Sequence, residues 1–364
     1  MSLATMVQRL PSAADLSYLC HRGCARSSKP PVAVDPPIVH RYAVIKKTAL
    51  GFGALLMLGV SAFMLGPQLP ADTTLQPVEL PDDLDRYLAA QEADVPNLRP
   101  GTEKTIVWAD STAKAKTPVA LVYVHGFTAS RGEVHPLCDT LAARLGANLY
   151  YTRLTGHGRD ADAMGTATLN DWLNDANEAY QIGQRLGEEV VLIGTSMGGA
   201  LVTWLTAQEQ VPDPLATVAI APAYGLYDAD AQQTLTRVAD WPWGEHLLQV
   251  QLGTYNGTPS EDPAINRYWT RRYRSDALLP LAQLIETLNQ TDFGAIDTPM
   301  FIAYSPNDNV VSPSAIEARF AALGAAPKDT LRLLDTGDPS NHVIAGRLRS
   351  PQTTEPVARA ILDF

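Results

Sequence analysis

Apolar and polar positions alternate in blocks along the chain from about residue 103 onward. Short apolar runs rich in β-branched residues predict strands, and the longer stretches between them have the spacing of amphipathic helices. The predicted strands are Thr105–Trp108, Val119–Val124, Asn148–Thr152, Val190–Ile193, Thr217–Ala221, Met300–Tyr304 and Thr330–Leu334. The predicted helices are Glu133–Leu145, Asp171–Leu186, Met197–Gln208, Ser314–Leu323 and Pro356–Leu362. Because several strands are apolar on both faces, this alternation predicts an α/β fold, a mainly parallel central sheet with helices on both faces.

The alternation is interrupted between Pro222 and about Asp297. This segment contains tryptophans, tyrosines and helix-like patches, but it has no clear rhythm of strands. We therefore predict that its first two-thirds form an inserted cap subdomain. On this interpretation residues 103–221 and 296–364 form the core of the fold, and residues 222–295 form the cap insertion.

A long uncharged segment lies near the N-terminus. Thr48–Gly66 contains 19 consecutive residues without a charge, close to the roughly 20 residues that a helix needs to cross a bilayer. Basic residues precede the segment (Arg41, Lys46 and Lys47) and acidic residues follow it, a distribution that keeps the N-terminal side in the cytoplasm. We predict a signal or membrane-anchor helix over residues 44–66 with the rest of the chain exported. A buried core helix is the alternative.

The apolar run continues beyond a possible cleavage site at Val60-Ser61-Ala62, which favours a retained anchor over a cleaved signal. Residues 1–43 have no helix or strand periodicity, and we expect them to be disordered or to precede the true start, which would then lie near Val44. Residues 67–102 are acidic and rich in proline. They predict a linker that carries a short helix at Leu80–Ala93.

Composition limits the classes of partner. The 364 residues carry a formal net charge of −11, whereas binding to nucleic-acid phosphates requires a surplus of lysine and arginine on one face. We therefore expect no nucleic-acid partner. Of the three cysteines only Cys138 falls in the predicted folded part, so a disulfide framework is excluded there. His135 shares a predicted helix with Cys138 but has no third ligand nearby, and we expect no metal site.

One serine interrupts an otherwise apolar and glycine-rich stretch, VLIGTSMGGA, at Ser196. Gly194-x-Ser196-x-Gly198 follows a predicted buried strand and opens a predicted helix, the context in which this motif forms a nucleophile elbow. Small neighbours permit the strained turn that lifts the serine oxygen clear of the sheet. The turn also leaves the N–H of Met197 at a helix N-terminus, where an oxyanion would form. The alternative role is a simple helix N-cap.

Further residues favour the nucleophile over the N-cap. The strand end Val124-His125-Gly126-Phe127-Thr128 supplies the Phe127 N–H as a second oxyanion donor. A serine nucleophile also needs a histidine base and an orienting carboxylate, which follow it in the order acid, then histidine. Asp308, just after the strand Met300–Tyr304, is the best acid, and His342 is the histidine beyond it. Asp335, Asp338 and Asp297 remain rival acids.

The five motifs together resemble a known superfamily. They are HGFTAS at 125–130, LTGHG at 154–158, GTSMGG at 194–199, NDNVV at 307–311 and NHV at 341–343. From about residue 103 to 364 the chain resembles the α/β-hydrolases, within them the monoacylglycerol lipase, carboxylesterase and serine aminopeptidase-like group. The resemblance implies Ser196 as nucleophile, His342 as general base and acid, Asp308 as its orienting partner, and Phe127 and Met197 as oxyanion donors. It implies structural roles for His125 and His157.

The function expected from these residues is cofactor-free hydrolysis of carboxylic esters, including lipid-derived esters such as monoacylglycerols. A serine peptidase or amidase of the same fold would share every motif and is an alternative. A non-catalytic binding protein of this fold is another, although all three triad positions are occupied. The cap aromatics either line an acyl pocket or form the core of the cap, and the sequence leaves both open; they are Trp241, Trp243, Tyr255, Tyr268 and Trp269.

Overall fold

The computed structural model describes residues 36–69 and 71–364. It consists of an N-terminal unit that ends at Ser61 and a folded unit, Ala62–Phe364. Helix α1 (Pro36–Met64) is the described part of the first unit and extends into the second. It begins before residue 44, the predicted start, because proline is tolerated in the first turn of a helix. The prediction of disorder or of a later start also concerns residues 1–35, which lie outside the described part of the chain. Ala43–Met64 is long and apolar enough to cross a membrane, by length and composition alone.

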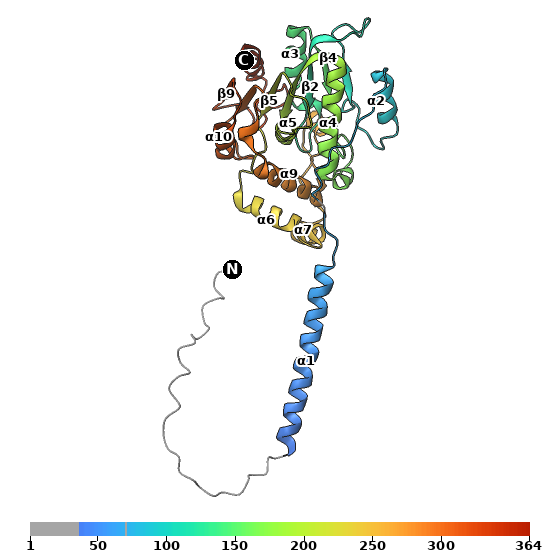
Figure 1. Ribbon diagram of the computed structural model, residues 1–364, viewed down its shortest axis with the longest axis vertical. Helices are drawn as coiled ribbons and strands as arrows, with labels where there is room; N and C mark the ends of the chain where they lie inside the picture. The colour runs from blue at the N-terminus through green and yellow to red at the C-terminus, as the bar shows by residue number, and fades with distance from the viewer. Residues whose placement is uncertain (1–35, 70) are drawn as a thin grey trace. The chain divides into compact units, whose positions relative to one another are not determined.

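The folded unit is built on a seven-stranded sheet in the order β1-β3-β2-β4-β5-β8-β9 (Figure 1). The strands are β1 (Thr105–Val107), β2 (Thr117–Val124), β3 (Asn148–Tyr151), β4 (Gly187–Thr195), β5 (Ala216–Ile220), β8 (Met300–Tyr304) and β9 (Lys328–Arg332). Only β1 runs antiparallel to its neighbour. The predicted mainly parallel sheet is therefore confirmed, and all seven predicted strands belong to it.

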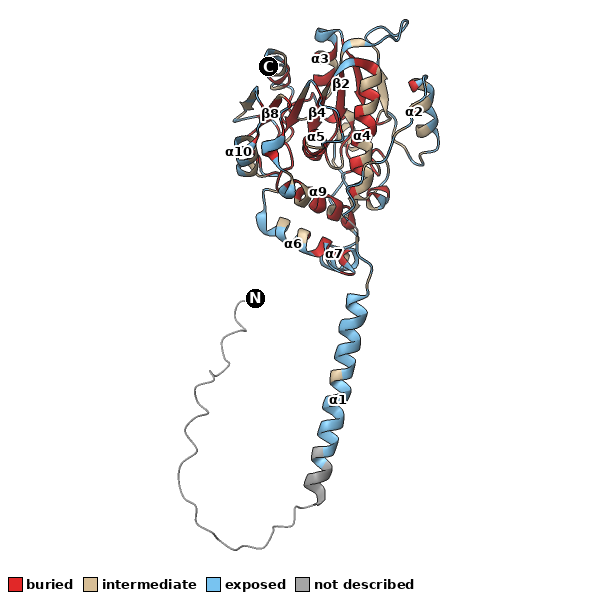
Figure 2. Ribbon diagram, in the orientation of Figure 1, coloured by how far each residue is buried: buried red, intermediate tan, exposed pale blue. Residues whose placement is uncertain are grey.

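Helices cover both faces of this sheet, as predicted. One face is covered by α4 (Leu169–Leu186), α5 (Met197–Thr206), α9 (Leu278–Gln290) and α10 (Pro313–Ala322), and the other by α3 (Leu137–Leu145) and α11 (Thr354–Asp363). Side chains of β2 alternate between the two layers: Val122 packs in the first core and Tyr123 in the second. This period of two follows from the pleat of the strand. Buried residues are concentrated in the sheet and in α4, α5 and α9 (Figure 2).

The cap is inserted between β5 and β8. It contains α6 (Ala229–Ala239), α7 (Gly244–Leu252) and α8 (Pro263–Tyr268), and it leads into α9. Its own small core includes Leu235, Leu248 and Leu279. The cap also contains a short antiparallel ribbon, in which β6 (Tyr255–Asn256) pairs with β7 (Tyr273–Arg274), although the segment shows no rhythm of strands in its sequence. Two-residue strands are too short to produce a periodic pattern.

The linker before the core contains the predicted short helix, α2 (Leu84–Ala93). Asp83 caps its first turn by accepting a hydrogen bond from the N–H of Arg86, a favoured use of aspartate at a helix start. Leu84 and Leu88 are buried against the same core layer as α4. Residues 67–102 therefore include a segment that packs on the folded unit.

Candidate active site

Ser196 lies in a sharp turn between the central strand β4 and helix α5. Its backbone has φ 54° and ψ −116°, a left-handed conformation that non-glycine residues rarely adopt. The turn requires a small residue at Gly198, where an added Cβ would lie 2.0 Å from the carbonyl oxygen of Val124. The expected steric role of this glycine is thus confirmed. The turn raises the Ser196 side chain above the carboxyl edge of the sheet.

The structure brings Ser196, His342 and Asp308 together. Nε2 of His342 lies 2.9 Å from Oγ of Ser196, and Nδ1 of His342 lies 2.8 Å from Oδ2 of Asp308. Oδ1 of Asp308 accepts hydrogen bonds from the N–H groups of Val310 and Val311. These bonds hold the carboxylate in place, while its second oxygen faces the imidazole.

The rival acids do not contact the His342 ring in the described structure. Asp297 is exposed, and Asp335 is exposed and accepts the N–H of Gly337. Asp338 is buried and acts on the backbone of the histidine loop, where it accepts the N–H of His342 at 3.1 Å. Arg349 donates to Asp338 through Nε at 2.7 Å. The sequence did not identify this supporting pair, since no motif connects two residues 11 positions apart in an irregular loop.

The two N–H groups predicted to hold an oxyanion come from different strand ends. Met197 is the first residue of α5, so its N–H has no partner within the helix. Phe127 follows the end of β2, and its ring packs edge-on against His157 and Tyr273. Within the described residues neither N–H donates to a protein acceptor. Both groups are therefore free to donate to a ligand.

A cavity of about 260 Å³ lies beside Ser196 and His342. Most of its wall is apolar, with side chains from the cap and from the strand ends: Phe127, Ala223, Leu226, Ile265, Trp269, Leu281, Val310, Val311 and Val343. Trp269 is thus the one member of the five cap aromatics that lines this cavity. Trp241 and Trp243 are exposed instead, which corrects the expectation that they form either the pocket or the core of the cap.

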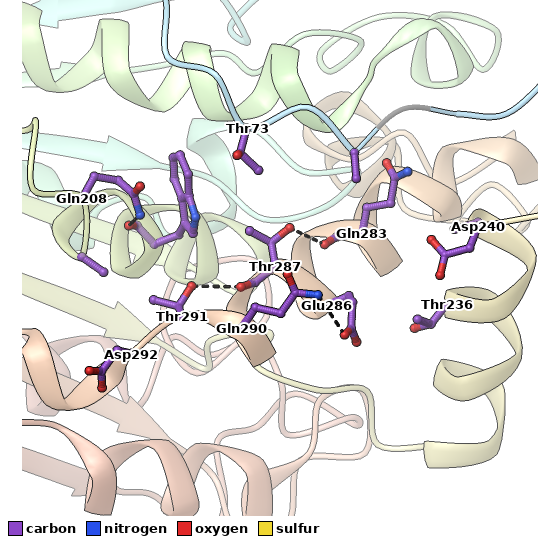
Figure 3. Close-up of a pocket in the computed structure, with 14 residues that line it drawn as sticks. Thr73, Gln208, Thr236, Asp240, Gln283, Glu286, Thr287, Gln290, Thr291 and Asp292 are labelled. Atoms are coloured by element: carbon purple, nitrogen blue, oxygen red, sulfur yellow. Dashed lines mark hydrogen bonds between the residues drawn. The ribbon is translucent and has the colours of Figure 1, made fainter.

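A larger cavity of about 510 Å³ lies elsewhere, between α6, α9 and the end of α5. Figure 3 shows that its walls are mainly polar, with threonine, glutamine and carboxylate side chains. Several of these groups bond within α9, such as Oγ1 of Thr287 to the carbonyl of Gln283 and Oγ1 of Thr291 to the carbonyl of Thr287. Ser196, His342 and Asp308 are not among its lining residues. Of these two cavities, only the smaller one is lined by Ser196 and His342.

His125 and His157 connect the loops behind the site. Nε2 of His125 accepts the N–H of Leu154, and Nε2 of His157 accepts the N–H of Thr128. Their Nδ1 atoms lie 2.9 Å and 3.1 Å from the carbonyls of Gly126 and Thr155. Burial lowers the pKa of His125 to about 4 and that of His157 well below its ordinary value. Both rings are neutral, as the structural roles require.

The sequence also missed Glu133, a buried carboxyl group at the end of β2. Its Oε1 accepts the N–H of Gly126 at 2.6 Å and the hydroxyl of Tyr123 at 2.7 Å. The Tyr123 hydroxyl lies 2.9 Å from Oγ1 of Thr195, the residue before Ser196. Glu133 thus connects the Phe127 loop with the Ser196 turn. Nothing in the local sequence RGEVHP distinguishes it from a solvent-exposed glutamate.

Burial raises the pKa of Glu133 to about 7, although the Gly126 N–H, the Tyr123 hydroxyl and His342 act in the opposite direction. A raised carboxyl pKa costs stability as the pH rises from the ordinary value through about 7, and the cost is absent below that range. We expect Glu133→Gln to remove this cost, which amounts to about 3 kcal/mol in unfolding free energy. Urea unfolding of the full chain in detergent at pH 5 and pH 8.5 measures it.

The matched control for this prediction is Glu209→Gln, since Glu209 is exposed. It should follow the wild-type loss of stability between the two pH values. The Glu133→Gln variant should show a smaller loss. A loss equal to that of the wild type would contradict the assignment of this titration to Glu133.

The chain is similar in sequence to known proteins. It matches the family model described as serine aminopeptidase, S33, over residues 115–337. It is 27% identical over 216 residues to a thermostable monoacylglycerol lipase of Bacillus sp. (strain H-257), covering 59% of this chain and 81% of that protein.

Solved structures are similar in fold. A structure described with LipS and LipT, two metagenome-derived lipolytic enzymes, has a TM-score of 0.57 and 22% identity, covering 73% of this chain and 98% of that one. A soluble variant of the monoglyceride lipase of Saccharomyces cerevisiae, in complex with a substrate analogue, has a TM-score of 0.55 and 14% identity, covering 74% and 96%. The fold is that of the α/β-hydrolases. The family model matches more than half of this chain, and the chain therefore belongs to the serine aminopeptidase, S33, family of hydrolases.

Proposed function

We propose that the protein is a serine hydrolase that cleaves carboxylic esters through an acyl-enzyme on Ser196. The main support is the hydrogen-bonded series Ser196–His342–Asp308 on a strained turn beside an apolar cavity. A serine hydroxyl is a weak nucleophile until a positioned base accepts its proton. The buried Asp308 carboxylate supplies the orientation that this base needs.

The proposed reaction has two halves. Oγ of Ser196 forms a bond to the carbonyl carbon of the ester while Nε2 of His342 takes the hydroxyl proton. The resulting oxyanion accepts hydrogen bonds from the N–H groups of Phe127 and Met197. The C–O bond to the alcohol then breaks, and His342 returns its proton to the leaving oxygen. Water repeats these steps on the acyl-enzyme and releases the carboxylic acid.

Lipid-derived esters, such as monoacylglycerols, are the proposed substrate class. The mainly apolar wall of the catalytic cavity favours an acyl chain. The similarity to a monoacylglycerol lipase supports the same class. A serine peptidase or amidase is the second candidate, because the matching family model is described as a serine aminopeptidase.

We further propose that α1 anchors the protein in a membrane, with the hydrolase unit on the extracytoplasmic side. Ala43–Met64 has the length for one crossing. Arg41, Lys46 and Lys47 lie at its N-terminal end, and an excess of such residues marks the cytoplasmic side.

A substrate panel together with active-site labelling tests this function. We expect the purified full chain to hydrolyse a chain-length series of p-nitrophenyl esters faster than aminoacyl p-nitroanilides. A fluorophosphonate should add one group, which peptide mass measurement should locate on Ser196. If the protein hydrolyses only the anilides, the proposed esterase function is wrong and the peptidase function takes its place. If the protein shows neither turnover nor labelling, it is a non-catalytic binding protein.

A further inference from the structure

The cap carries an uncovered apolar surface. Five large apolar side chains within residues 241–252 are exposed, and together we call them the docking face: Trp241, Trp243, Leu247, Val250 and Leu252. Val250 is 87% exposed. Trp241 and Trp243 are also the most exposed of the six tryptophans, since Trp172, Trp204 and Trp269 are buried and Trp108 is half-buried. A cluster of this kind marks an interaction site more often than scattered single residues do.

The docking face is not the inner side of a badly packed helix. Leu248 of α7 is buried in the core of the cap, together with Leu235 and Leu279. Leu247 and Val250 point away from that core and remain exposed. Helix α7 is therefore apolar on its outer side as well as on its packed side. A cap surrounded by water gains nothing from such an arrangement.

The docking face is attached to the chain that leaves the apolar segment. The N–H of Trp243 donates to the carbonyl of Pro67 at 2.8 Å, and Nε2 of Gln283 donates to the carbonyl of Leu69 at 3.0 Å. The indole of Trp243 lies directly against Gly66, where an added Cβ would be 2.0 Å from its Nε1. A larger residue at position 66 would require the indole to shift. Residues 66–69 are therefore held against the cap.

The covalent chain limits the distance between this contact and a bilayer. The candidate span ends at Met64, and Gly66 follows two residues later, a reach of roughly 7 Å at most. Each interfacial region of a bilayer is about 5 to 7 Å thick. Trp243, in contact with Gly66, would then lie at the depth where tryptophan is enriched in membrane proteins. The position of the span in the sequence thus identifies a lipid surface as the partner that covers the docking face.

We propose that the docking face binds the bilayer interface and turns the cap toward the membrane from which the substrate is drawn. The inference rests on the proposed anchor and the proposed ester hydrolysis. Leu226 links the two sites, because it packs against the core of the cap and also lines the catalytic cavity. Docking would place this wall of the cavity close to lipid, so that an ester could enter without crossing water. Apolar burial supplies the binding.

Tryptophan fluorescence in brominated phosphatidylcholine vesicles tests docking without any turnover. Helix α1 contains no tryptophan, so quenching of the reconstituted full chain reports on the folded unit alone. We expect quenching that the double variant Trp241→Phe/Trp243→Phe abolishes. Quenching that persists in this variant, or its absence in the wild type, would overturn the proposal. Flotation of the protein with the vesicles separately reports whether the anchor inserts.

Hydrolysis of two esters by the same vesicles tests the consequence. We expect Val250→Glu to lower the hydrolysis of a bilayer-resident monoacylglycerol by about tenfold or more, with hydrolysis of water-soluble p-nitrophenyl acetate unchanged. Leu334→Glu is the matched control, since Leu334 is 72% exposed and lies after β9, outside the cap. It should leave both rates unchanged.

The outcomes separate docking from the function on which it rests. An equal loss in both variants, or no loss in Val250→Glu, would overturn docking. Absence of turnover on both esters in the wild type would contradict the hydrolase proposal, while the quenching result would still decide docking. Concentration-dependent dimerisation that Val250→Glu abolishes, without bromolipid quenching, would assign the face to a second copy of this chain and overturn the proposal.

Discussion

Ser196→Ala should lower kcat/KM for p-nitrophenyl esters by about 10⁴- to 10⁶-fold, because the substitution removes the atom that we propose forms the acyl bond. Among the described residues the Ser196 hydroxyl bonds to Nε2 of His342, which lines the cavity and can bond to water once the hydroxyl is gone. We therefore expect a folded protein with wild-type thermal stability. Residual turnover should come from binding and the oxyanion donors alone. Steady-state kinetics of the purified variant measure the loss.

The matched control for this prediction is Ser314→Ala, an exposed serine on α10. Its activity should equal that of the wild type. If Ser196→Ala keeps more than a tenth of the wild-type rate, a different nucleophile performs the reaction. Fluorophosphonate labelling of Ser196→Ala would then identify that group.

Asp308→Asn should lower kcat by about 10⁴-fold without unfolding the protein. The amide oxygen of asparagine can still accept the N–H groups of Val310 and Val311, which now bond to Oδ1. The amide nitrogen would then face Nδ1 of His342 and require it to act as an acceptor. The imidazole proton moves to Nε2 in that tautomer. Nε2 can no longer take the proton of Ser196, so catalysis fails while the fold persists. Stopped-flow or steady-state hydrolysis measures the loss of kcat.

Asp335→Asn is the control for the orienting acid. Asp335 is exposed on the loop of His342 and was a rival acid in the sequence. Its replacement should leave kcat within about twofold of the wild type, because it touches neither ring nitrogen. A large loss in Asp335→Asn together with a small loss in Asp308→Asn would reverse the assignment of the acid.

Much of the fold could be predicted because its elements have strong local signals. The strands β2, β4 and β8 are apolar on both faces, a pattern that water-facing segments do not show. The turn at Ser196 has a local signal as well, because the glycines that its backbone requires, Gly194 and Gly198, lie two residues to either side. The β6 and β7 ribbon escaped prediction because two residues contain no period. Helix α1 was predicted too short, because its first residues are Pro36 and Pro37. A proline in the first turn of a helix cannot be told from sequence apart from a proline that interrupts a helix.

Contacts between distant residues could not be predicted. Asp338 and Asp308 both lie in polar loops near strand ends, and only the fold directs one toward the backbone of His342 and the other toward its ring. Glu133 has an ordinary local sequence, and its burial follows from the packing of β2, α3 and the Ser196 turn around it. The cap aromatics divide between an exposed face and a cavity wall, because short helices can place them on either side.

The sequence by itself determined the class of fold, the position of the Ser196 turn and the presence of an apolar N-terminal segment, because each depends on side chains adjacent along the chain. The tertiary structure alone decided which acid faces His342, which aromatic side chain lines the catalytic cavity and which remain on the outer side of the cap. These outcomes depend on the packing of segments up to 146 residues apart, as for Ser196 and His342. Local pattern holds no information on that packing.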